Sequence, residues 1–242
     1  TLVGNERNIV TDIAGTTRDS VHTHFNLYGF DFELIDTAGL RRKKQIEDQL
    51  EFYSTVRTIR SIEQSDVCLL LIDAQNGMER QDQAIFWQVV NSYRGVVILV
   101  NKWDLIEKNH QTMKTFEAAI RERIAPFTDV PILFTSNLTK QRILKAFEEA
   151  MEVYENRNYK IPTSQLNDFL LPIIQNQPPP IYKGKMVRIK YVTQIKSQTP
   201  TFAFYCNLPQ YIKDPYKRFL ENHIRSEWDL SGVTIRLFFR EK

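Results

Sequence analysis

Residues 96–104 read VVILVNKWD, a run of five apolar residues that leads directly into a polar turn. An uninterrupted apolar run of this length is typical of a parallel strand whose two faces are both covered. Similar runs lie at Val67 to Ile72 and at Pro131 to Phe134, and residues 30–35 alternate between apolar and polar side chains. These four segments predict the strands of one domain.

Amphipathic segments that predict helices separate these strands: Leu50 to Glu63, Arg80 to Ser92, Thr112 to Ile124 and Gln141 to Asn156. Alternating strands and helices predict a doubly wound, mostly parallel α/β sheet over residues 1–156. Ligands bind at the carboxyl ends of the strands in such a sheet, so the polar residues found there are candidate site residues.

Asn101, Lys102 and Asp104 follow the strand 96–100 with the spacing NKxD. A carboxylate at Asp104 can accept hydrogen bonds from N1–H and the 2-amino group of guanine, and adenine has neither donor. A buried carboxylate left unpaired costs on the order of 1–3 kcal/mol. Asn101 would hold the loop and reach the purine edge, and the stem of Lys102 would cover the ring face. The alternative is a helix-start turn capped by Asp104.

The segment Asp36-Thr37-Ala38-Gly39 ends the strand predicted at 30–35. Asp36 would hold Mg²⁺ through a water molecule. Gly39 would bring its backbone N–H close to a γ-phosphate, where a Cβ would obstruct the approach. An ordinary strand-to-turn connection is the alternative for this segment.

Two further clusters have the order and context of a nucleotide site. In GTTRD at residues 15–19, Thr17 is our choice as a direct Mg²⁺ ligand, with Thr16 second. Ser136 and Asn137 follow the strand 132–134, where a backbone N–H can contact guanine O6. Each cluster alone could be a simple turn, but their common order favours a GTP- or GDP-binding site.

Residues 157–242 predict a second unit. A helix at Thr163 to Asn176 ends before three prolines, strands follow at Lys185 to Gln194 and Thr201 to Asn207, and a helix from Pro215 to Trp228 precedes a strand at Val233 to Arg240. Residues 159–242 contain 13 Lys and Arg against 6 Asp and Glu, a net charge of +7. Residues 1–158 contain 19 against 23, a net charge of −4.

This basic α-β-β-α-β unit is a candidate for RNA binding. The cations that we expect to contact phosphates are Lys185, Arg188, Lys190, Lys217, Arg218 and Arg225. The alternative is that these residues only keep a small domain soluble. Most aromatic residues of the unit alternate as core residues do, and we expect them to be mostly buried: Tyr182, Tyr191, Phe202, Phe204, Trp228, Phe238 and Phe239.

Several segments together carry a family resemblance: GTTRD, DTAGLRRK, EFYSTVRTIRSIE, NKWDL, TKQRI and NLPQYIKDPYKRFLENHIR. The chain resembles the EngA (Der) family of bacterial GTPases, which have two tandem G domains and a C-terminal KH-like domain. The match covers the second G domain and the KH-like domain. It implies a P-loop-NTPase-like fold, GTP or GDP with Mg²⁺, a preceding G domain in the parent protein, and a cytoplasmic ribosome assembly factor that engages the RNA of the large subunit.

Three departures from the family pattern bear on function. Residues 1–242 contain no GxxxxGK[S/T] phosphate-binding loop, so we expect a fragment with little nucleotide affinity by itself. Leu40 stands where Ras-like enzymes orient water with Gln, so no catalytic residue is certain. Some relatives use K⁺ in hydrolysis, which makes K⁺ a possible cofactor. Residues 159–242 also lack the GxxG loop of KH domains.

Other function classes fit the sequence less well. The longest apolar runs are too short for a membrane span, and Cys68 and Cys206 lack the spacing of metal or redox sites. Asn101 and Asp104 together disfavour an ATP-using enzyme. The alternative to a GTPase is a non-enzymatic RNA- or ribosome-binding module with a G-like scaffold, and the sequence upstream of Thr1 would discriminate the two.

Overall fold

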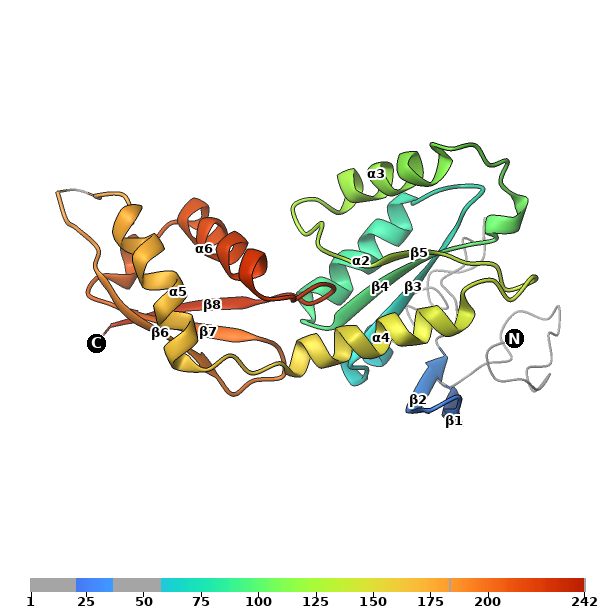
Figure 1. Cartoon of the computed structure of the whole chain (residues 1–242), viewed down its shortest axis with the longest axis horizontal. Helices are drawn as coiled ribbons and strands as arrows, with labels where there is room; N and C mark the ends of the chain where they lie inside the picture. The colour runs from blue at the N-terminus through green and yellow to red at the C-terminus, as the bar shows by residue number, and fades with distance from the viewer. Residues whose placement is uncertain (1–20, 37–57, 183, 242) are drawn as a thin grey trace, which may run out of the picture.

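The structure is a computed structural model that describes residues 21–36, 58–182 and 184–241. Its central sheet consists of the parallel strands β3 (Val67–Asp73), β4 (Gly95–Asn101) and β5 (Ile132–Phe134), in the order β3-β4-β5. Two helices, α2 (Arg80–Asn91) and α3 (Thr112–Ile124), lie on one side of the sheet, and α4 (Ile143–Asn158) lies on the other (Figure 1). The alternating strands and helices predicted from the sequence are thereby confirmed for this part of the chain.

The alternation of side chains along β4 explains the two layers. Val96, Ile98 and Val100 belong to the core beneath α2 and α3, whereas Val97 and Leu99 pack with residues of α4. All five side chains are buried. A strand covered on both faces needs apolar residues at every position, which is why the run is uninterrupted.

A hairpin lies beside α4. Strands β1 (Val21–Leu27) and β2 (Phe30–Asp36) pair antiparallel, with Tyr28 and Gly29 in the left-handed region at φ 57° and 82°. Two such residues match the tight turn of a two-residue hairpin. Phe25 and Phe32 each place a ring 5.0–5.1 Å from that of Phe147 on α4. Within the described ranges, no ladder joins this hairpin to the central sheet.

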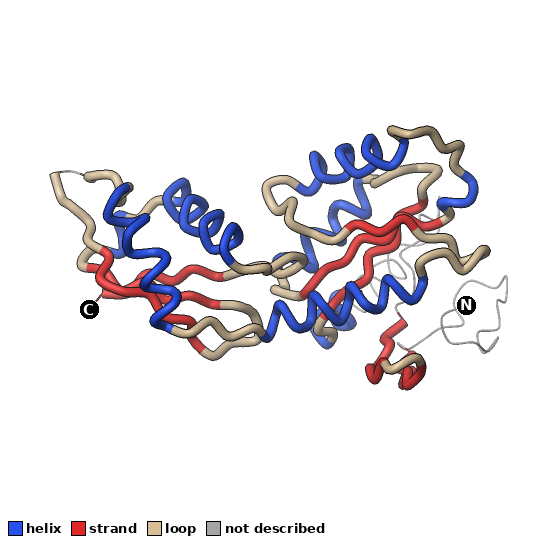
Figure 2. The backbone as a smooth tube through the Cα atoms, in the orientation of Figure 1, coloured by secondary structure: helices blue, strands red, loops and turns tan. Residues whose placement is uncertain are grey.

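The second unit has the predicted α-β-β-α-β order (Figure 2). It comprises α5 (Thr163–Asn176), β6 (Ile189–Ile195), β7 (Thr201–Cys206), α6 (Asp214–Glu227) and β8 (Arg236–Glu241). β7 lies in the middle of the sheet, antiparallel to β6 and parallel to β8. Its core contains buried side chains from both helices and the central strand: Leu166, Leu170, Phe202, Phe204, Leu220 and Ile224.

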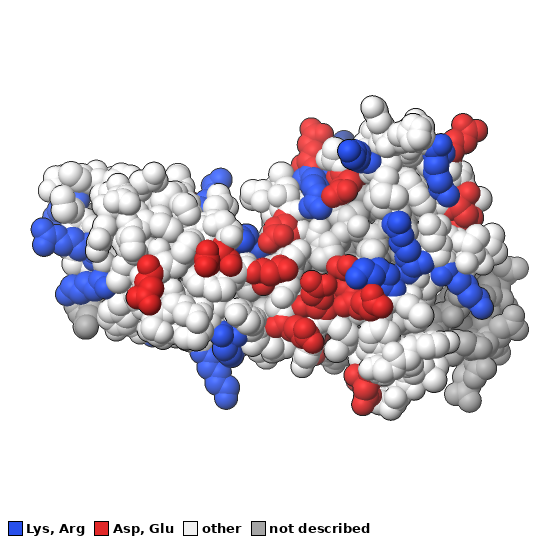
Figure 3. Space-filling view, viewed as in Figure 1, with Lys and Arg blue, Asp and Glu red and all other residues white. Residues whose placement is uncertain are grey.

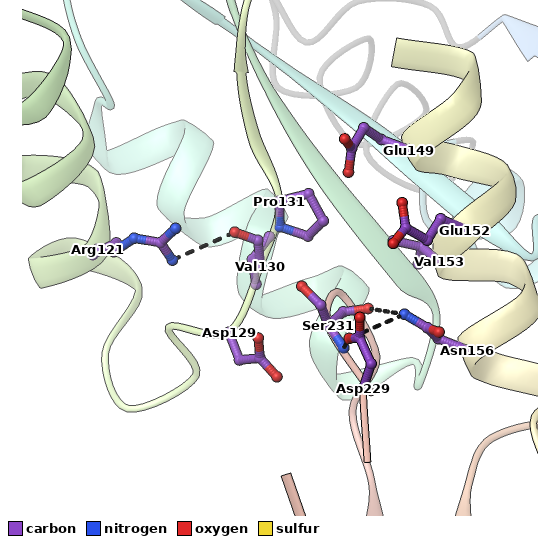
Figure 4. A pocket seen from close by; sticks show the side chains of 10 residues that line it. All are labelled: Arg121, Asp129, Val130, Pro131, Glu149, Glu152, Val153, Asn156, Asp229 and Ser231. Carbon is purple, nitrogen blue, oxygen red and sulfur yellow. Dashed lines mark hydrogen bonds between the residues drawn. The ribbon is translucent and has the colours of Figure 1, made fainter. Parts of the chain in front are cut away.

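The loop between α6 and β8 joins the second unit to the first. The backbone of Gly232 accepts a hydrogen bond from the N–H of Val96 (2.9 Å) and donates one to the carbonyl of Asp129 (2.9 Å). Val233 belongs to the core cluster beneath α4. A polar pocket of about 220 Å³ lies at this contact, with Glu149, Asp129 and Asp229 among its lining residues (Figure 4).

This contact lies at the amino ends of β4 and β5, because Val96 is the second residue of the first strand and Asp129 precedes the second. The polar residues predicted to bind a nucleotide follow the carboxyl ends of the same strands. The second unit and the candidate nucleotide site therefore lie at opposite ends of the parallel sheet.

Candidate functional site

The turn after β4 is anchored by a tryptophan. Trp103 begins a 3-10 helix (Trp103–Leu105), is buried, and packs its ring 4.4 Å from that of Phe134 and 5.2 Å from that of Phe116. The backbone N–H of Trp103 donates to the backbone carbonyl of Thr135 (3.0 Å). Because Trp103 points into the core, the residues on either side of it, Lys102 and Asp104, remain at the surface of the site.

Lys102 adopts the left-handed conformation, at φ 61°, and its ammonium lies 2.6 Å from a carboxylate oxygen of Asp73. Asp73 is the last residue of β3 and lies in register with Asn101. The hydrogen bond from Lys102 holds the pKa of the Asp73 carboxyl below its ordinary value of 3.8. The backbone N–H of Gln75 also donates to this carboxylate (3.0 Å).

Sequence reasoning missed Asp73. The signal that could have found it is its position at the carboxyl end of the strand next to β4, where a side chain can reach Lys102.

Asn101 links the turn to the next loop. Its side-chain oxygen accepts a hydrogen bond from the backbone N–H of Asn137 (3.2 Å). The side chain of Ser136 is buried, and its hydroxyl oxygen accepts the N–H of Thr139 (3.1 Å). The backbone of Ser136 also exchanges two hydrogen bonds with Gln141 (3.3 and 3.0 Å). The structure therefore brings Asn101, Ser136 and Asn137, three of the predicted site residues, together.

One consequence concerns the predicted contact with guanine O6. The N–H groups of both Ser136 and Asn137 already donate inside this loop. A contact from either of them to a base would have to replace one of these hydrogen bonds. Asn101 could release Asn137 when its own side chain turns toward a purine.

Asp104 has a different environment. Its carboxylate is half-buried, and no side chain or backbone group in the described ranges forms a hydrogen bond or ion pair with it. A carboxylate in this position, next to Asn101 and Lys102, has the acceptor pair that a guanine edge requires. Asp104 therefore lies beside Asn101 and Lys102 with a carboxylate that has no partner within the described ranges.

The phosphate and metal half lies outside the described residues. This applies to Thr17, Thr37, Ala38, Gly39 and Leu40, and to the side chain of Asp36, whose backbone ends β2. Over the described ranges, no group of three or more His, Cys, Asp or Glu side chains could hold a metal ion. The Mg²⁺ ligands predicted from the sequence thus stay predictions.

The six cations predicted to contact RNA separate into two groups. Lys185, Arg188, Lys190 and Arg218 are exposed, and Lys217 forms an exposed ion pair with Asp214 (2.8 Å). Arg225 is only 12% exposed and binds the carboxylates of Asp129 (3.0 Å) and Glu221 (3.1 Å). It also donates to the carbonyls of Leu230 and Val233, so it joins the two units and does not face solvent.

Comparison with known proteins agrees with this architecture. A family model described as 50S ribosome-binding GTPase matches residues 1–102, and one described as the KH-domain-like C-terminal domain of EngA bacterial GTPase enzymes matches residues 160–240. An Era variant of Aquifex aeolicus, solved with GDP·AlF₄⁻, has a TM-score of 0.52 at 19% identity and covers 100% of this chain and 87% of its own. Fold and site together define a P-loop-GTPase-like unit followed by a KH-like unit.

Two relatives narrow the class to a family. The GTPase Der of Christiangramia forsetii is 58% identical over 241 residues, which are 100% of this chain and 56% of the relative. The GTPase Der of Bacteroides fragilis is 58% identical over 243 residues, with 100% and 56% covered. The chain belongs to the EngA (Der) family of bacterial GTPases, and it spans about half the length of these curated relatives.

Each helix within the described ranges is too short or too polar to cross a membrane.

Proposed function

We propose that residues 58–158 form the base-selecting part of a GTP- and GDP-binding site. The observation that carries this proposal is the Asp104 carboxylate, which has no partner in the described ranges and lies beside a loop braced by Asn101 and Asn137. The carboxylate would accept N1–H and the 2-amino group of guanine. Lys102, held by Asp73, would cover the ring with its stem.

The chemistry we propose for the parent protein is slow GTP hydrolysis with Mg²⁺. Thr17 and Asp36 would hold the metal, which would neutralise charge on the phosphates when bound. Thr37, Ala38 and Gly39 would contact the γ-phosphate, and Leu40 offers no group to orient water. Dependence on K⁺ stays a prediction that potassium-for-sodium exchange in a hydrolysis assay would test.

For the polypeptide 1–242 alone, we propose nucleotide binding weaker than micromolar. Its sequence has no GxxxxGK[S/T] segment, whose backbone N–H groups and lysine bind phosphates. Isothermal titration with GDP and Mg²⁺ tests this point. A dissociation constant in the micromolar range or tighter would contradict it.

We further propose that the chain acts in assembly of the large ribosomal subunit in the cytoplasm. The description of the family model that matches residues 1–102 supports this choice of partner. The exposed cations Lys185, Arg188, Lys190 and Arg218 of the KH-like unit would contact phosphates of its RNA. Filter binding of residues 1–242 to deproteinised large-subunit RNA across a salt series tests the proposal, and affinity indifferent to salt would contradict phosphate contacts.

The second candidate, an RNA-binding module with a purely structural G-like unit, makes the opposite prediction for the base site. It expects no preference between GDP and ADP at Asp104.

A further inference from the structure

An exposed aromatic turn lies between α5 and β6. Tyr182 and Lys185 exchange two backbone hydrogen bonds (3.1 and 3.0 Å), and Gly184 closes the turn at φ 72°. Tyr182 is 37% exposed, and its neighbours Ile181 and Met186 are more exposed still. The sequence pattern places Tyr182 among residues expected to be mostly core, but the turn carries its ring to the surface.

A second tyrosine joins it from a distant segment. Tyr211 ends a 3-10 helix (Pro209–Tyr211), and its ring centroid lies 5.1 Å from that of Tyr182, with an angle of 34° between the rings. We call these two side chains the tyrosine platform.

Asn207 fixes the two halves of the platform relative to each other. Its side chain accepts the N–H of Arg188 (2.8 Å) and donates to the carbonyl of Met186 (3.1 Å). The segment that leads from the Tyr182 turn into β6 is thereby bound to the segment that leads to Tyr211. Because both halves are hydrogen-bonded in place, the rings are positioned before any partner binds.

Two lysines flank the rings. The ammonium of Lys213 lies 4.9 Å from the ring centroid of Tyr182, and that of Lys185 lies 5.7 Å from the ring centroid of Tyr211. Neither forms an ion pair with a carboxylate in the described ranges, in contrast to Lys217, which is paired with Asp214. The platform therefore carries two cations that remain available to an anionic partner.

The charge of the surrounding surface favours the same kind of partner. On the face shown in Figure 3, acidic side chains gather over α4 and the contact between the units. Lys and Arg side chains lie at the outer end of the KH-like unit and also over the first unit. Exposed rings with adjacent cations are the combination that binds unpaired nucleotides, since bases stack on the rings and phosphates meet the cations.

We propose that the tyrosine platform binds single-stranded RNA by stacking a nucleobase on Tyr182 and Tyr211, with Lys185 and Lys213 on the flanking phosphates. The proposal rests on the proposed RNA-binding function and specifies that the contact is with unpaired bases. Bases inside a duplex are stacked on each other and cannot reach a ring on the protein surface. The platform also supplies a binding mode for a KH-like unit whose sequence has no GxxG loop.

The test is fluorescence anisotropy of residues 1–242 with a short labelled single-stranded RNA and with the matching duplex. Tyr182→Leu and Tyr211→Leu keep apolar bulk but remove the ring, and each should weaken single-strand binding by about 5- to 100-fold. The slope of affinity against salt should stay unchanged. Lys185→Gln and Lys213→Gln should each lower that slope by about one.

Tyr154→Leu is the matched control, because Tyr154 is 41% exposed on α4 and lies in the other unit. It should bind RNA like the unmodified chain. Circular dichroism verifies that each variant folds. Tyr182→Leu is the decisive variant, because the Tyr182 ring is exposed on a turn and its loss should not disturb folding.

If the chain binds single-stranded RNA and Tyr182→Leu binds it equally well, the platform is overturned while the proposed RNA-binding function stands. Equal binding of the duplex, with the same loss on removing Tyr182, would also overturn it. If the unmodified chain binds no RNA, the proposed function fails and the platform with it.

Discussion

The side chain of Asp73 shows how one residue outside the predicted motifs can shape a binding site. Lys102 combines a left-handed backbone with an ammonium held 2.6 Å from Asp73, so its stem is directed before a base arrives. A residue other than glycine adopts the left-handed region only where its surroundings hold it there, since its Cβ makes this conformation unfavourable. Asp73 therefore acts as a positioning residue for Lys102.

A titration tests this pair. The pKa of Asp73 should lie below 3.8, because the hydrogen bond from Lys102 favours the ionised carboxylate. A lowered pKa contributes stability that is present above pH 3.8 and is lost as the pH falls through the folded-state value. Carboxyl carbon shifts of Asp73, measured by NMR, report the midpoint. Lys102→Gln should raise it, and an unchanged midpoint would mean that the pair does not form in solution.

At the scale of elements, the loop between α6 and β8 depends on a glycine. Gly232 has φ 73°, and a Cβ there would lie 2.5 Å from Val153 Cγ2 and 2.9 Å from the carbonyl oxygen of Val96. Neither the backbone carbonyl nor the buried Val153 side chain can move without disturbing the core beneath α4.

Gly232→Ala should therefore lower the free energy of unfolding in urea by about 2–4 kcal/mol. Gly184→Ala is the matched control, because Gly184 has nearly the same φ, 72°, and a Cβ added to it would meet no atom within 4 Å. It should cost only about 1 kcal/mol from backbone strain. Equal losses in the two variants would show that the loop is not packed against β4 as described.

Much of the element order was predictable from sequence, and the exceptions have physical causes. The helix predicted at Thr163 to Asn176 is confirmed at both ends. Three prolines follow its C-terminal end and prevent the helix from continuing. The strand predicted from Lys185 begins only at Ile189, since Lys185 pairs with Tyr182 in an isolated bridge. Strand β1 was not predicted, and its apolar face becomes evident only when Phe25 packs against Phe147.

The site divides in the same way. Asn101, Asp104 and Ser136 follow strands directly, so chain position alone predicted their neighbourhood. The contacts of Asp73 and Arg225 depend on register and packing between segments distant in sequence, which periodicity does not report. An arginine on an amphipathic helix has the same pattern whether it faces solvent or a neighbouring unit.

Part of the helix predicted from Leu50 lies outside the described residues; residues 58–64 are helical.

For the whole molecule, Arg225 is the main polar connection between the two units. It bonds Asp129 in the first unit and Glu221 and two carbonyls in the second, and its guanidinium lies 5.0 Å from the ring centroid of Phe127. Asn156 on α4 adds a polar contact near the same junction, by donating to the carbonyl of Ser231 (3.3 Å). This arrangement connects the unit that contains the central sheet β3-β4-β5 to the KH-like unit.

Arg225→Met should destabilise the chain by about 2–4 kcal/mol, because two carboxylates and two carbonyls lose a buried partner. Lys217→Met, on the same helix, removes an exposed ion pair and should cost less than about 1 kcal/mol. Urea unfolding followed by circular dichroism gives both values. A similar small loss for the two variants would contradict the role of Arg225 as a connection between the units.

The central claim is that the loop after β4 selects guanine, and two-dimensional NMR of residues 1–242 tests it most directly because it detects weak binding. Adding GDP should shift the amide signals of Asn101, Asp104 and Asn137, whereas ADP at the same concentration should not. Asp104→Asn replaces an acceptor by a donor, so the response should move from GDP to XDP, whose base has a carbonyl in place of the 2-amino group. Equal shifts with ADP and GDP, or an undiminished response of Asp104→Asn to GDP, would contradict the account.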